Sequence, residues 1–580
     1  MQLLSLKLHR TYKGLKDQYF DFSNTSGNII ALIGLNGSGK SQLLELMAET
    51  FAYLERWQRT DFRTRTSLGF GVTVTYKCNT SRDSALLAYH DTLFSNVTTI
   101  RVTIKLDGDV GLEVWDGSDW EHLLGEKDFP LPYVVGYSSG LNENLQRSFM
   151  KNSVQYFEVM RTRLKRKKEL SSELNDEQIS EINQRYLKRN PHIFEPEEEY
   201  LTTNSGERIT TEDGTPIEVN NYLLGLRESD TPASKCVFLD YDSAGLFLLS
   251  LAILKKAEIS SILNEVTYKY PTKAILRYDL RRDVSGVDTV RDIQMLVSIA
   301  GDGNIKGIGK RTTDKIFDIY ELDYLAGDIT LDFTNDELID RLREKNYNDP
   351  ISLFNRLFKI QQLGVANWQS IIRQQLRKDN FIGTVKKPLK TKLPLSILDL
   401  SLADDSGKEV SFDDLSDGEA QLLQVLVASR LFAEQNTLFL FDEPETHLNP
   451  SWRTHFHRQL SKAIASQEGN ESQSQVFLST HSPFMVSSLK RESVMFFERN
   501  ESGQIRMEPV ENQTYGASFD VLIKEHFDLQ SLISQTVVKD IKAHLPKGDT
   551  PAEREESKQW IMENVGESME KAYLIRKLQS

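Results

Sequence analysis

Two short segments, separated by almost the whole chain, carry residue types that suit phosphate chemistry. The first, residues 34–41, reads GLNGSGKS and fits the phosphate-binding pattern G-x-x-x-x-G-K-[ST]. A glycine-rich loop lets backbone N–H groups point at a triphosphate, and a helix that begins after it adds its positive end. The expected nucleotide-binding residues are Gly34, Asn36, Gly37, Ser38, Gly39, Lys40 and Ser41. Lys40 would reach the β- and γ-phosphates of ATP, and the Ser41 hydroxyl would bind Mg²⁺.

The second segment is an apolar stretch that ends in two carboxylates. Residues 437–441 read TLFLF and lead directly into Asp442 and Glu443. Parallel-sheet folds place catalytic residues at the ends of such strands. Asp442 is therefore predicted to share the Mg²⁺ with Ser41, and Glu443 to polarise the attacking water. Taken alone, the segment could equally be a strand that ends in an acidic turn for structural reasons.

Two further motifs accompany these segments. Residues 415–419 read LSDGE, a run typical of a helix start, and a helix N-terminus attracts phosphate. Residues 480–483 read THSP, and residues 442–450 read DEPETHLNP. Together with the phosphate loop, these motifs resemble the ABC-type (AAA, non-transporter) ATPases. The longest string is similar to the bacterial branch that includes overcoming-lysogenisation-defect proteins and the ATPases encoded beside restriction and anti-phage systems.

This resemblance implies a head-to-head homodimer that holds two ATP molecules at its interface. It assigns the signature that contacts the second copy's γ-phosphate to Ser416, Gly418 and Glu419, and the dimer-interface loop to His447 and Asn449. His481 would bind the γ-phosphate or orient the water, although alone it would be interpreted as a capped structural histidine. The signature reads SDGE where transporters carry SGGQ, which disfavours transport.

Two expected parts of such a site have no clear counterpart in the sequence. A buried strand at 132–135 stands where a glutamine-bearing loop should follow, but Tyr-Ser-Ser comes next, and Gln146 is only a weak candidate. Arg10 and Tyr12 are the candidates for contacting the adenine.

Hydrophobic patterning predicts an α/β fold. Apolar residues alternate over 66–80 and 98–115, as in strands, and recur at helical spacing over 40–57. With the resemblance, this implies an ABC-ATPase head of the P-loop NTPase class, with a mixed sheet and an antiparallel β subdomain, interrupted by a large, mostly helical insertion. The expected segments are a first head lobe at 1–144, an insertion of helices with some strands at 145–394, a second head lobe at 395–520, and a C-terminal helical segment at 521–580.

Length, net charge, cysteine content and apolar stretches limit the classes of protein to which the chain can belong. The 580 residues exceed what a bare nucleotide fold needs, and the formal net charge of −14 disfavours a protein that coats nucleic acid, while permitting a local basic groove. Only two cysteines occur, Cys78 and Cys236, which fits a reducing compartment. No stretch approaches the roughly 18 apolar residues of a membrane helix. A cytoplasmic protein without membrane contact is predicted.

Several patterns invite other interpretations. An apolar run before Asp240 and Asp242 resembles a metal-nuclease motif, but no upstream glutamate supports it, so a structural role is favoured. Residues 303–310 imitate a phosphate loop with the wrong spacing and are interpreted as a loop between strands. His455 and His457 are two positions apart, so a helix would point them to different faces, which disfavours a metal pair.

Two basic runs remain open to interpretation. One spans residues 161–168, and the other consists of Lys386, Lys387, Lys390 and Lys392. A solvated helix face explains either run, and binding to a phosphate backbone or an acidic partner is the alternative.

The sequence and the resemblance favour an ATPase that closes into a homodimer on ATP and reopens on hydrolysis. Its expected setting is a bacterial anti-phage or restriction-associated system, where it would be the sensor or motor for a partner nuclease. One alternative is a DNA-repair or chromosome-organising ATPase that binds DNA directly. Another is a toxin controlled by its ATPase, with an effector in the insertion.

Overall fold

The computed structural model describes the chain in two compact units, Met1–Tyr515 and Gly516–Ser580. Its description covers all residues except 65–66, 80–96, 124–126, 128, 140–142, 171–172, 197–198, 201–210, 212–217, 220–224, 229–230, 282–286, 312–321, 386–392, 466–473, 527–533, 547, 549 and 580. The second basic run, at 386–392, therefore lies outside the described residues. No helix among the described residues is both long enough and apolar enough to cross a membrane.

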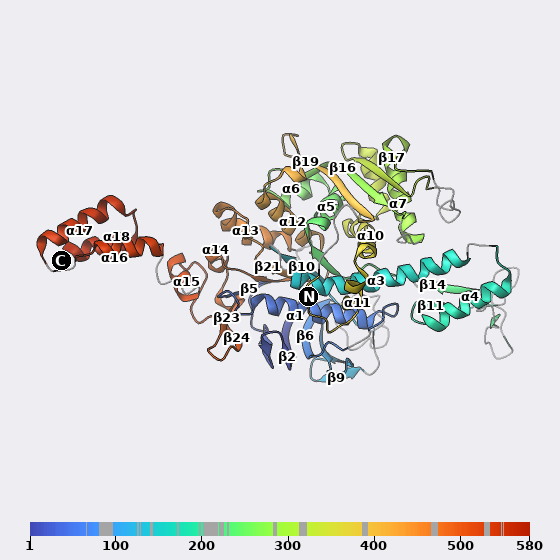
Figure 1. Cartoon of the computed structure of the whole chain (residues 1–580), viewed down its shortest axis with the longest axis horizontal. Coiled ribbons are helices and arrows are strands. Elements are labelled where there is room, and N and C mark those ends of the chain that lie inside the picture. Colours follow the sequence, from blue (N-terminus) through green and yellow to red (C-terminus); the bar gives the residue numbers. More distant parts are fainter. Residues whose placement is uncertain are drawn as a thin grey trace. The chain divides into compact units, whose positions relative to one another are not determined.

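A seven-stranded sheet forms the centre of the first unit (Figure 1). Its strands lie in the order β15-β10-β21-β22-β5-β23-β24, and all neighbours are parallel except β23 and β24. Their bounds, in the same order, are Cys236–Leu239, Tyr133–Ser138, Thr437–Asp442, Ser474–Ser479, Ile29–Gly34, Val494–Arg499 and Ile505–Pro509. Every residue of β5, β21 and β22 is buried, which explains why these strands read as continuous apolar runs.

A second, antiparallel sheet packs on the first through helix α1 (Lys40–Gln58). Its order is β4-β1-β6-β7-β8-β9, with bounds Tyr19–Asp21, Gln2–His9, Gly71–Asn79, Val97–Ile104, Val110–Trp115 and Trp120–Leu123. One apolar core joins both sheets and α1, and the edge-to-face pair of Phe51 and Tyr76, 5.7 Å between ring centroids, is part of it. The predicted α/β head with an antiparallel β subdomain is confirmed. Near this sheet, β2 (Thr11–Tyr12) and β3 (Leu15–Lys16) form a short hairpin.

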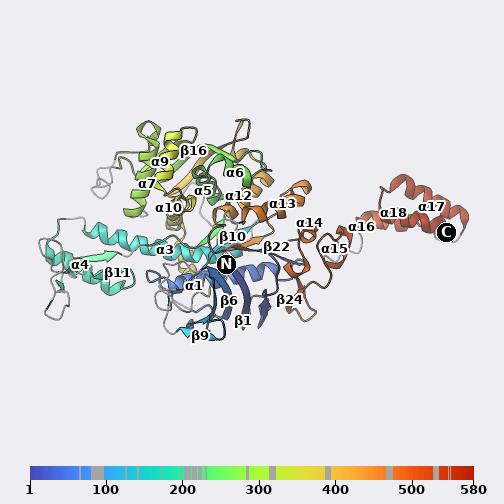
Figure 2. The same ribbon diagram turned by 180° about the vertical axis from the view of Figure 1, so that it is seen from behind.

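Helices α12 (Asp417–Leu431) and α13 (Pro450–Ala463) lie on the face of the central sheet opposite α1, and both views agree on this arrangement (Figure 2). The remaining helices of this region are short: α14 (Pro483–Ser487) and the 3₁₀ turns η5 (Phe412–Asp414) and η6 (Arg491–Ser493). The central sheet is therefore covered on both faces, as a parallel sheet requires.

The middle of the chain contains helices and a third sheet. Its helices are α3 (Glu143–Leu170), α4 (Asp176–Arg189), α5 (Tyr241–Ser250), α6 (Lys256–Ile262), α7 (Val287–Ala300), α9 (Asp336–Lys345), α10 (Pro350–Gln362) and α11 (Ser370–Leu376), with 3₁₀ turns η1 (Leu251–Ile253), η2 (Asp302–Asn304) and η3 (Leu363–Asn367). Two short antiparallel pairs lie near α4: β11 (Phe194–Pro196) with β14 (Leu226–Glu228), and β12 (Glu199–Tyr200) with β13 (Glu218–Val219).

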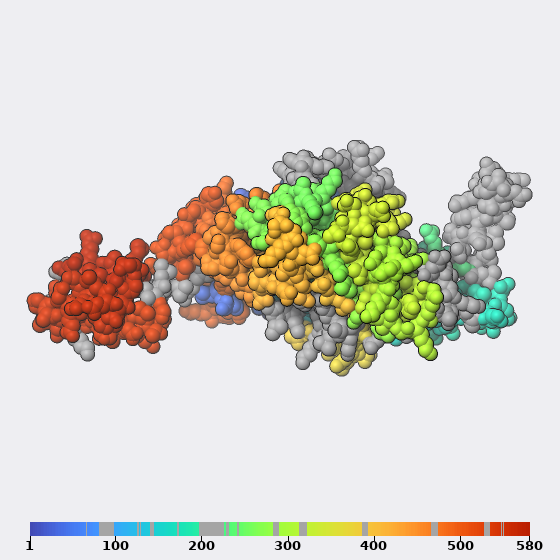
Figure 3. Space-filling model, turned by 90° about the horizontal axis from the view of Figure 1, so that it is seen from above, coloured from blue at the N-terminus to red at the C-terminus, as the bar shows by residue number. Residues whose placement is uncertain are grey.

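The third sheet has the order β17-β18-β16-β19-β20, with bounds Ile305–Gly307, Ala326–Asp332, Tyr270–Asp279, Leu395–Ala403 and Glu409–Ser411. Strand β16 pairs with β19 over most of its length, so the expected boundary between 394 and 395 falls inside one sheet. In Figure 3 the yellow-green and orange residues of these two chain regions accordingly share one face. The division into four segments stays a prediction.

The second unit is helical, with α15 (Phe519–His526), α16 (Gln535–His544), α17 (Pro551–Asn564) and α18 (Met569–Gln579). Its core is small and centres on Ile541, Ile561 and Val565. The His544 ring stacks on Trp560 with centroids 3.9 Å apart, which ties α16 to α17.

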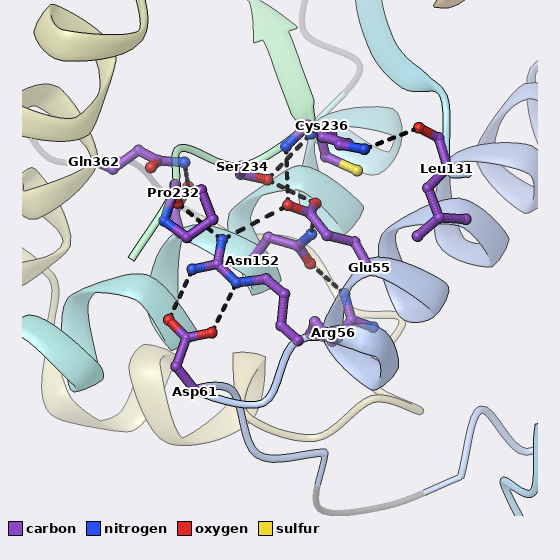
Figure 4. Close-up of polar contacts among 12 residues, drawn as sticks. Glu55, Arg56, Asp61, Leu131, Asn152, Pro232, Ser234, Cys236 and Gln362 are labelled. Atoms are coloured by element: carbon purple, nitrogen blue, oxygen red, sulfur yellow. Dashed lines mark hydrogen bonds and ion pairs between the residues drawn. The ribbon is translucent and has the colours of Figure 1, made fainter. Parts of the chain in front are cut away.

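A network of buried polar side chains joins the end of α1 to α3 (Figure 4). Asn152 donates to Glu55 Oε2 and accepts from Arg56 Nη1, each at 2.5 Å. Ser234 also donates to Glu55 Oε2, at 2.8 Å, and Arg56 Nε donates to Asp379 Oδ1 at 2.9 Å. Buried charges are tolerated only when they are paired in this way, so α1 and α3 must keep one relative position.

Nearly two turns earlier on α1, Glu49 accepts hydrogen bonds from two cations of α3. Lys151 Nζ lies 3.0 Å from Glu49 Oε2, and Arg147 Nε lies 3.3 Å from Oε1. Burial lowers the pKa of Lys151 to about 8, although Glu49 opposes this shift. Burial alone would raise the pKa of Glu49, but Lys151, Arg147 and Arg56 outweigh it and hold this pKa below its ordinary value.

We expect Lys151→Met to destabilise the first unit. Removing one partner of a buried ion pair typically costs about 3–5 kcal/mol, and Arg147 still faces Glu49, so we expect a loss near 3 kcal/mol in the free energy of unfolding. Urea denaturation followed by circular dichroism would measure it. Lys105→Met is the matched control, because Lys105 pairs with Asp109 at the surface, where both side chains are more than half exposed. Equal effects of the two substitutions would contradict the importance of the buried network.

Candidate nucleotide-binding site

The phosphate loop connects β5 to α1, and the β23–β24 hairpin packs against it. Gly34 has φ 134°, and a Cβ there would lie 2.2 Å from the Phe497 carbonyl oxygen. Gly39 has φ 109°, and a Cβ there would lie 2.8 Å from Ile505 Cδ1. Arg499 Nε also donates to the Gly37 carbonyl oxygen at 3.1 Å. Only glycine fits the first two positions, because both the backbone conformation and the space exclude a side chain.

Lys40 is the first residue of α1, and its side chain turns back over the loop. Its Nζ donates to the carbonyl oxygens of Gly34, at 2.8 Å, and Leu35, at 3.1 Å. Burial lowers the pKa of Lys40 to about 8, while Glu443 and Asp442 act in the opposite direction. These two carbonyl groups hold the ammonium group at the phosphate loop. Phosphate oxygens could take their place as hydrogen-bond acceptors.

Ser41 and Asp442 meet although 401 positions separate them in the chain. Ser41 Oγ donates to Asp442 Oδ1 at 2.9 Å, and Ser479 Oγ, at the end of β22, donates to the same oxygen at 2.5 Å. A hydroxyl and a carboxylate are hard oxygen ligands of the kind that Mg²⁺ prefers. The residues present therefore fit a magnesium ion.

Glu443 follows the carboxyl end of β21 in an unusual backbone conformation. Its φ is 53°, a left-handed value that a non-glycine residue adopts only when its surroundings enforce it. Its N–H donates to the Ser479 carbonyl oxygen at 3.1 Å, and Thr446 Oγ1 lies 3.3 Å from its Oε2. His481 Nε2 lies 3.7 Å from its Oε1. The strained backbone directs this carboxylate to the edge of the sheet where the phosphate loop lies.

His481 is half-buried beside these groups. Burial lowers its pKa, Lys40 lowers it further, and Glu443 and Asp442 oppose these effects. A neutral imidazole can accept a hydrogen bond at one nitrogen and donate one at the other. This residue is therefore able to contact both a phosphate oxygen and a water molecule.

The signature residues open α12. Ser416 is the N-cap, and its side chain accepts from the Glu419 N–H, while the Glu419 side chain accepts from the Ser416 N–H, which completes a capping box. The helix start at LSDGE agrees with the expectation from the sequence. Among the hydrogen bonds of the described residues, none joins Ser416, Gly418 or Glu419 to the phosphate loop of the same chain.

The loop from Glu443 to Asn449 has three exposed residues, of which Thr446 is one. His447 and Asn449 are exposed, and Asn449 also caps α13 by accepting from the Trp452 N–H at 2.9 Å. The Arg453 guanidinium fixes the loop from inside by donating to the carbonyl oxygens of Leu448 and Thr446, each at 2.8 Å. The roles assigned to His447 and Asn449 stay predictions.

Sequence reasoning did not single out Glu445. Its side chain is buried, and Thr480, the neighbour of His481, donates to its Oε1. Burial raises the pKa of Glu445 to about 7; Thr480 and Arg453 oppose this shift, and Glu443 adds to it. The residue is the second glutamate of the DEPE string, so its place in the motif was visible, but nothing in the sequence indicated its burial.

Gln146 and Tyr12, two of the candidates for the remaining contacts, have other partners. Gln146 is buried and donates through Nε2 to Asp240 Oδ2 at 2.9 Å, which removes it from the phosphate loop. Tyr12 cannot stack on adenine, because its ring is 2% exposed and packs against Phe70 at 5.0 Å. Arg10 is exposed in the turn near the hairpin, where its N–H donates to Asp17. A contact between Arg10 and the adenine stays a prediction.

The other patterns have structural explanations. Asp240 is the N-cap of α5 and accepts from the Ser243 N–H at 2.8 Å, which favours its structural role; the Asp242 side chain lies outside the described residues. Residues 302–307 form η2 and the edge strand β17. His455 and His457 belong to α13, and no group of three or more metal-ligating His, Cys, Asp or Glu side chains occurs among the described residues.

The basic run on α3 is not a continuous solvated face. Arg163 and Arg166 are buried, and Arg166 Nε donates to Asn183 Oδ1 at 2.9 Å, while its guanidinium lies over the Phe194 ring. Arg166 therefore helps to pack α3 against α4 and β11, and Arg163 is withdrawn from solvent as well. This reduces the charge that the run offers to a phosphate backbone.

Comparisons with known proteins bear on the class of protein to which the chain belongs. The family described as "AAA domain, putative AbiEii toxin, Type IV TA system" matches residues 313–487, which include the signature, the carboxylate pair and His481 but not the phosphate loop. No curated protein matches the chain. The match, together with the fold and the geometry above, supports an ATPase domain of the AAA/ABC type in this part of the chain.

Among solved structures, the chain is similar to an Smc head domain with an extended coiled coil from Pyrococcus furiosus, bound to the C-terminal domain of ScpA. The identity is 10%, the TM-score 0.30, and the match covers 93% of this chain and 99% of that one. It is also similar to an SMC head domain from Thermotoga maritima, with 10% identity, a TM-score of 0.28, and coverage of 88% and 100%. Likenesses this weak carry no argument about function.

Glu445 leads to a prediction about stability and pH. Its folded-state pKa, about 7, lies above the ordinary value of 4.5, so its contribution to stability is complete below pH 4.5 and is lost as the pH rises through 7. Glu445→Gln, which cannot ionise, should therefore match the wild type at low pH and exceed it above pH 7. Each unit of difference between folded and unfolded pKa is worth about 1.4 kcal/mol, so we expect a gain on the order of 3 kcal/mol.

Urea denaturation of both proteins between pH 4.5 and 8 would test this expectation. Glu498→Gln, at an exposed glutamate of β23, is the control and should show no such divergence. A constant difference between Glu445→Gln and wild type at every pH would contradict the raised pKa.

Proposed function

We propose that this chain binds and hydrolyses ATP at the edge of the sheet where β5, β21 and β22 end. The observation that carries the proposal is the hydrogen bond between Ser41 and Asp442, which joins the phosphate loop to the carboxylate pair. A glycine loop, a lysine, a hydroxyl, two carboxylates and a histidine then lie close together at this edge. This is the donor and acceptor set that phosphoryl transfer to water requires.

Each residue has a distinct task in this proposal. Lys40 exchanges the carbonyl oxygens of Gly34 and Leu35 for phosphate oxygens and stabilises the charge that develops on them. Glu443 accepts a proton from the attacking water and holds that water in line with the γ-phosphate. Mg²⁺, held by Ser41 and Asp442, would neutralise phosphate charge when bound. His481 bonds to the γ-phosphate or to the water.

ATP would also join two copies of the chain. The signature helix start offers a phosphate-binding N-terminus at Ser416, but no hydrogen bond of the described residues connects it to the phosphate loop of its own chain. His447 and Asn449 are exposed on the loop that follows Glu443. These features support a head-to-head homodimer in which the signature of one copy completes the site of the other.

For the biological setting, the resemblance of the DEPETHLNP string supports a sensor or motor in an anti-phage or restriction-associated system with a partner nuclease. The matched family, whose description names a toxin of a toxin–antitoxin system, supports the alternative of an ATPase-controlled toxin. Growth arrest on expression of the wild-type chain alone, relieved by a site mutation, would favour the toxin. Nuclease activity that appears only with a neighbouring gene product would favour the partner system.

We expect Lys40→Ala to abolish ATP turnover, because the substitution removes the cation that stabilises the transferred phosphoryl group. Losing a charge-stabilising group of this kind lowers kcat by about 100-fold or more. Phosphate release would measure turnover, and Lys7→Ala, at an exposed lysine of β1, is the control. Turnover by Lys40→Ala close to that of the control would contradict the site assignment.

We expect Glu443→Gln to accumulate as an ATP-bound dimer. The amide keeps the size of the side chain and its contact with Thr446 but cannot take a proton from water, so ATP binds and is not cleaved. Light scattering after gel filtration would show the mass doubling with ATP and remaining monomeric without it. A variant that stays monomeric at saturating ATP would contradict the proposed homodimer with ATP at its interface.

A further inference from the structure

Gln421 lies within the second turn of α12 and connects three parts of the site. Its side chain is 4% exposed. Its Nε2 donates to the Tyr137 hydroxyl at 2.8 Å, and its Oε1 accepts from the His447 N–H at 3.0 Å. One amide therefore joins the signature helix to β10 and to the loop that follows the carboxylate pair. No motif in the sequence marks this residue.

The Tyr137 end of this bridge is fixed. Tyr137 pairs with Phe441 in the parallel register of β10 and β21, and the next pair in this register is Ser138 with Asp442. Its side chain is buried, and burial raises its pKa to about 12, although the hydrogen bond from Gln421 opposes this. The hydroxyl therefore remains protonated, at a set position beside the strand that carries the carboxylates.

The His447 end touches the signature directly. A Cβ on Gly418 would lie 2.7 Å from the His447 carbonyl oxygen, so the first turn of α12 rests against the backbone of the loop. Gln421 binds the N–H of the same residue, one turn further along α12. The His447 backbone is consequently hydrogen-bonded to α12 through its N–H and packed against the same helix at its carbonyl group.

The same loop sets the position of Glu443. Thr446 Oγ1 lies 3.0 Å from the Glu443 carbonyl oxygen and 3.3 Å from its Oε2. Glu443 also has a left-handed backbone, which persists only where the surrounding contacts enforce it. If the His447 N–H lost its acceptor, the loop would lose a hydrogen bond one residue beyond Thr446, the hydrogen-bonding neighbour of Glu443 in the turn.

We propose that Gln421 is a positioning residue for Glu443: it fastens the 443–449 loop to the signature helix and to β10, and so holds the carboxylate where it can act on water. This inference rests on the proposed ATPase function. It also implies that a displacement of the signature helix, on contact with the nucleotide of a second copy, reaches the 443–449 loop through Gln421 and through the contact of Gly418 with His447.

The test is Gln421→Met, which keeps the length and volume of the side chain but makes neither hydrogen bond. Small displacements of a catalytic group cost up to about 100-fold in rate, so we expect kcat for ATP to fall by roughly 10- to 100-fold. The affinity for a fluorescent ATP analogue should change by less than about twofold, because Lys40 and Ser41 are untouched. Gln424→Met, the same substitution at another buried glutamine of α12, is the matched control and should keep the wild-type kcat.

A double-mutant cycle with Thr446→Val separates positioning from a general loss of stability. If both residues act on Glu443 through the loop, their effects on kcat will be less than additive. Additive effects, or a Gln421→Met kcat equal to that of Gln424→Met, would overturn this inference while wild-type turnover leaves the ATPase proposal standing. A wild-type chain that binds no ATP would overturn both.

Discussion

The parallel order β21-β22-β5 is the constraint on which the site depends. It places the carboxyl ends of three buried strands at one edge, so that Ser41 and Asp442 meet with Ser479 between their strands. Two other features of the site depend on the position of this edge. The phosphate loop must turn sharply there, and Glu443 must adopt a left-handed backbone to leave the strand. Continuous burial keeps these strands in the interior of a covered sheet, because none of them offers a polar face to water.

The second constraint is the burial of charge beneath the site. Glu49, Arg147 and Lys151 have almost no contact with solvent, so α1 and α3 can separate only by exposing or stranding charges. Helix α1 carries Lys40 and Ser41 at one end and this network further along. Helix α3 is therefore attached to α1 by buried ion pairs as well as by apolar contacts. Because ion pairs need a defined geometry, they make the position of α3 relative to α1 specific.

Sequence reasoning located those features that depend on neighbouring residues. The strand–loop–helix of 29–58, the strand that ends at Asp442 and the helix start at Ser416 all have local signals. Features that depend on distant pairing were not predictable. Strand β16 pairs with β19 across more than a hundred residues, Tyr12 is buried by Phe70, and Gln421 acquires its partners only when α12, β10 and the 443–449 loop come together. Two of the arginines in the basic run of α3 likewise proved to be packing residues.

The hairpin beneath the phosphate loop has a consequence for how this domain should be delimited. All recognisable motifs end before residue 488, and the family match ends at 487. Yet Phe497 and Ile505 contact the loop at Gly34 and Gly39, and Arg499 holds Gly37. A fragment that ended at residue 487 would keep every motif residue. It would lose the β23–β24 hairpin, against which the phosphate loop packs. The smallest fragment that keeps the phosphate loop in this conformation therefore extends at least through β24. Residues that belong to no motif help to shape the proposed nucleotide-binding site.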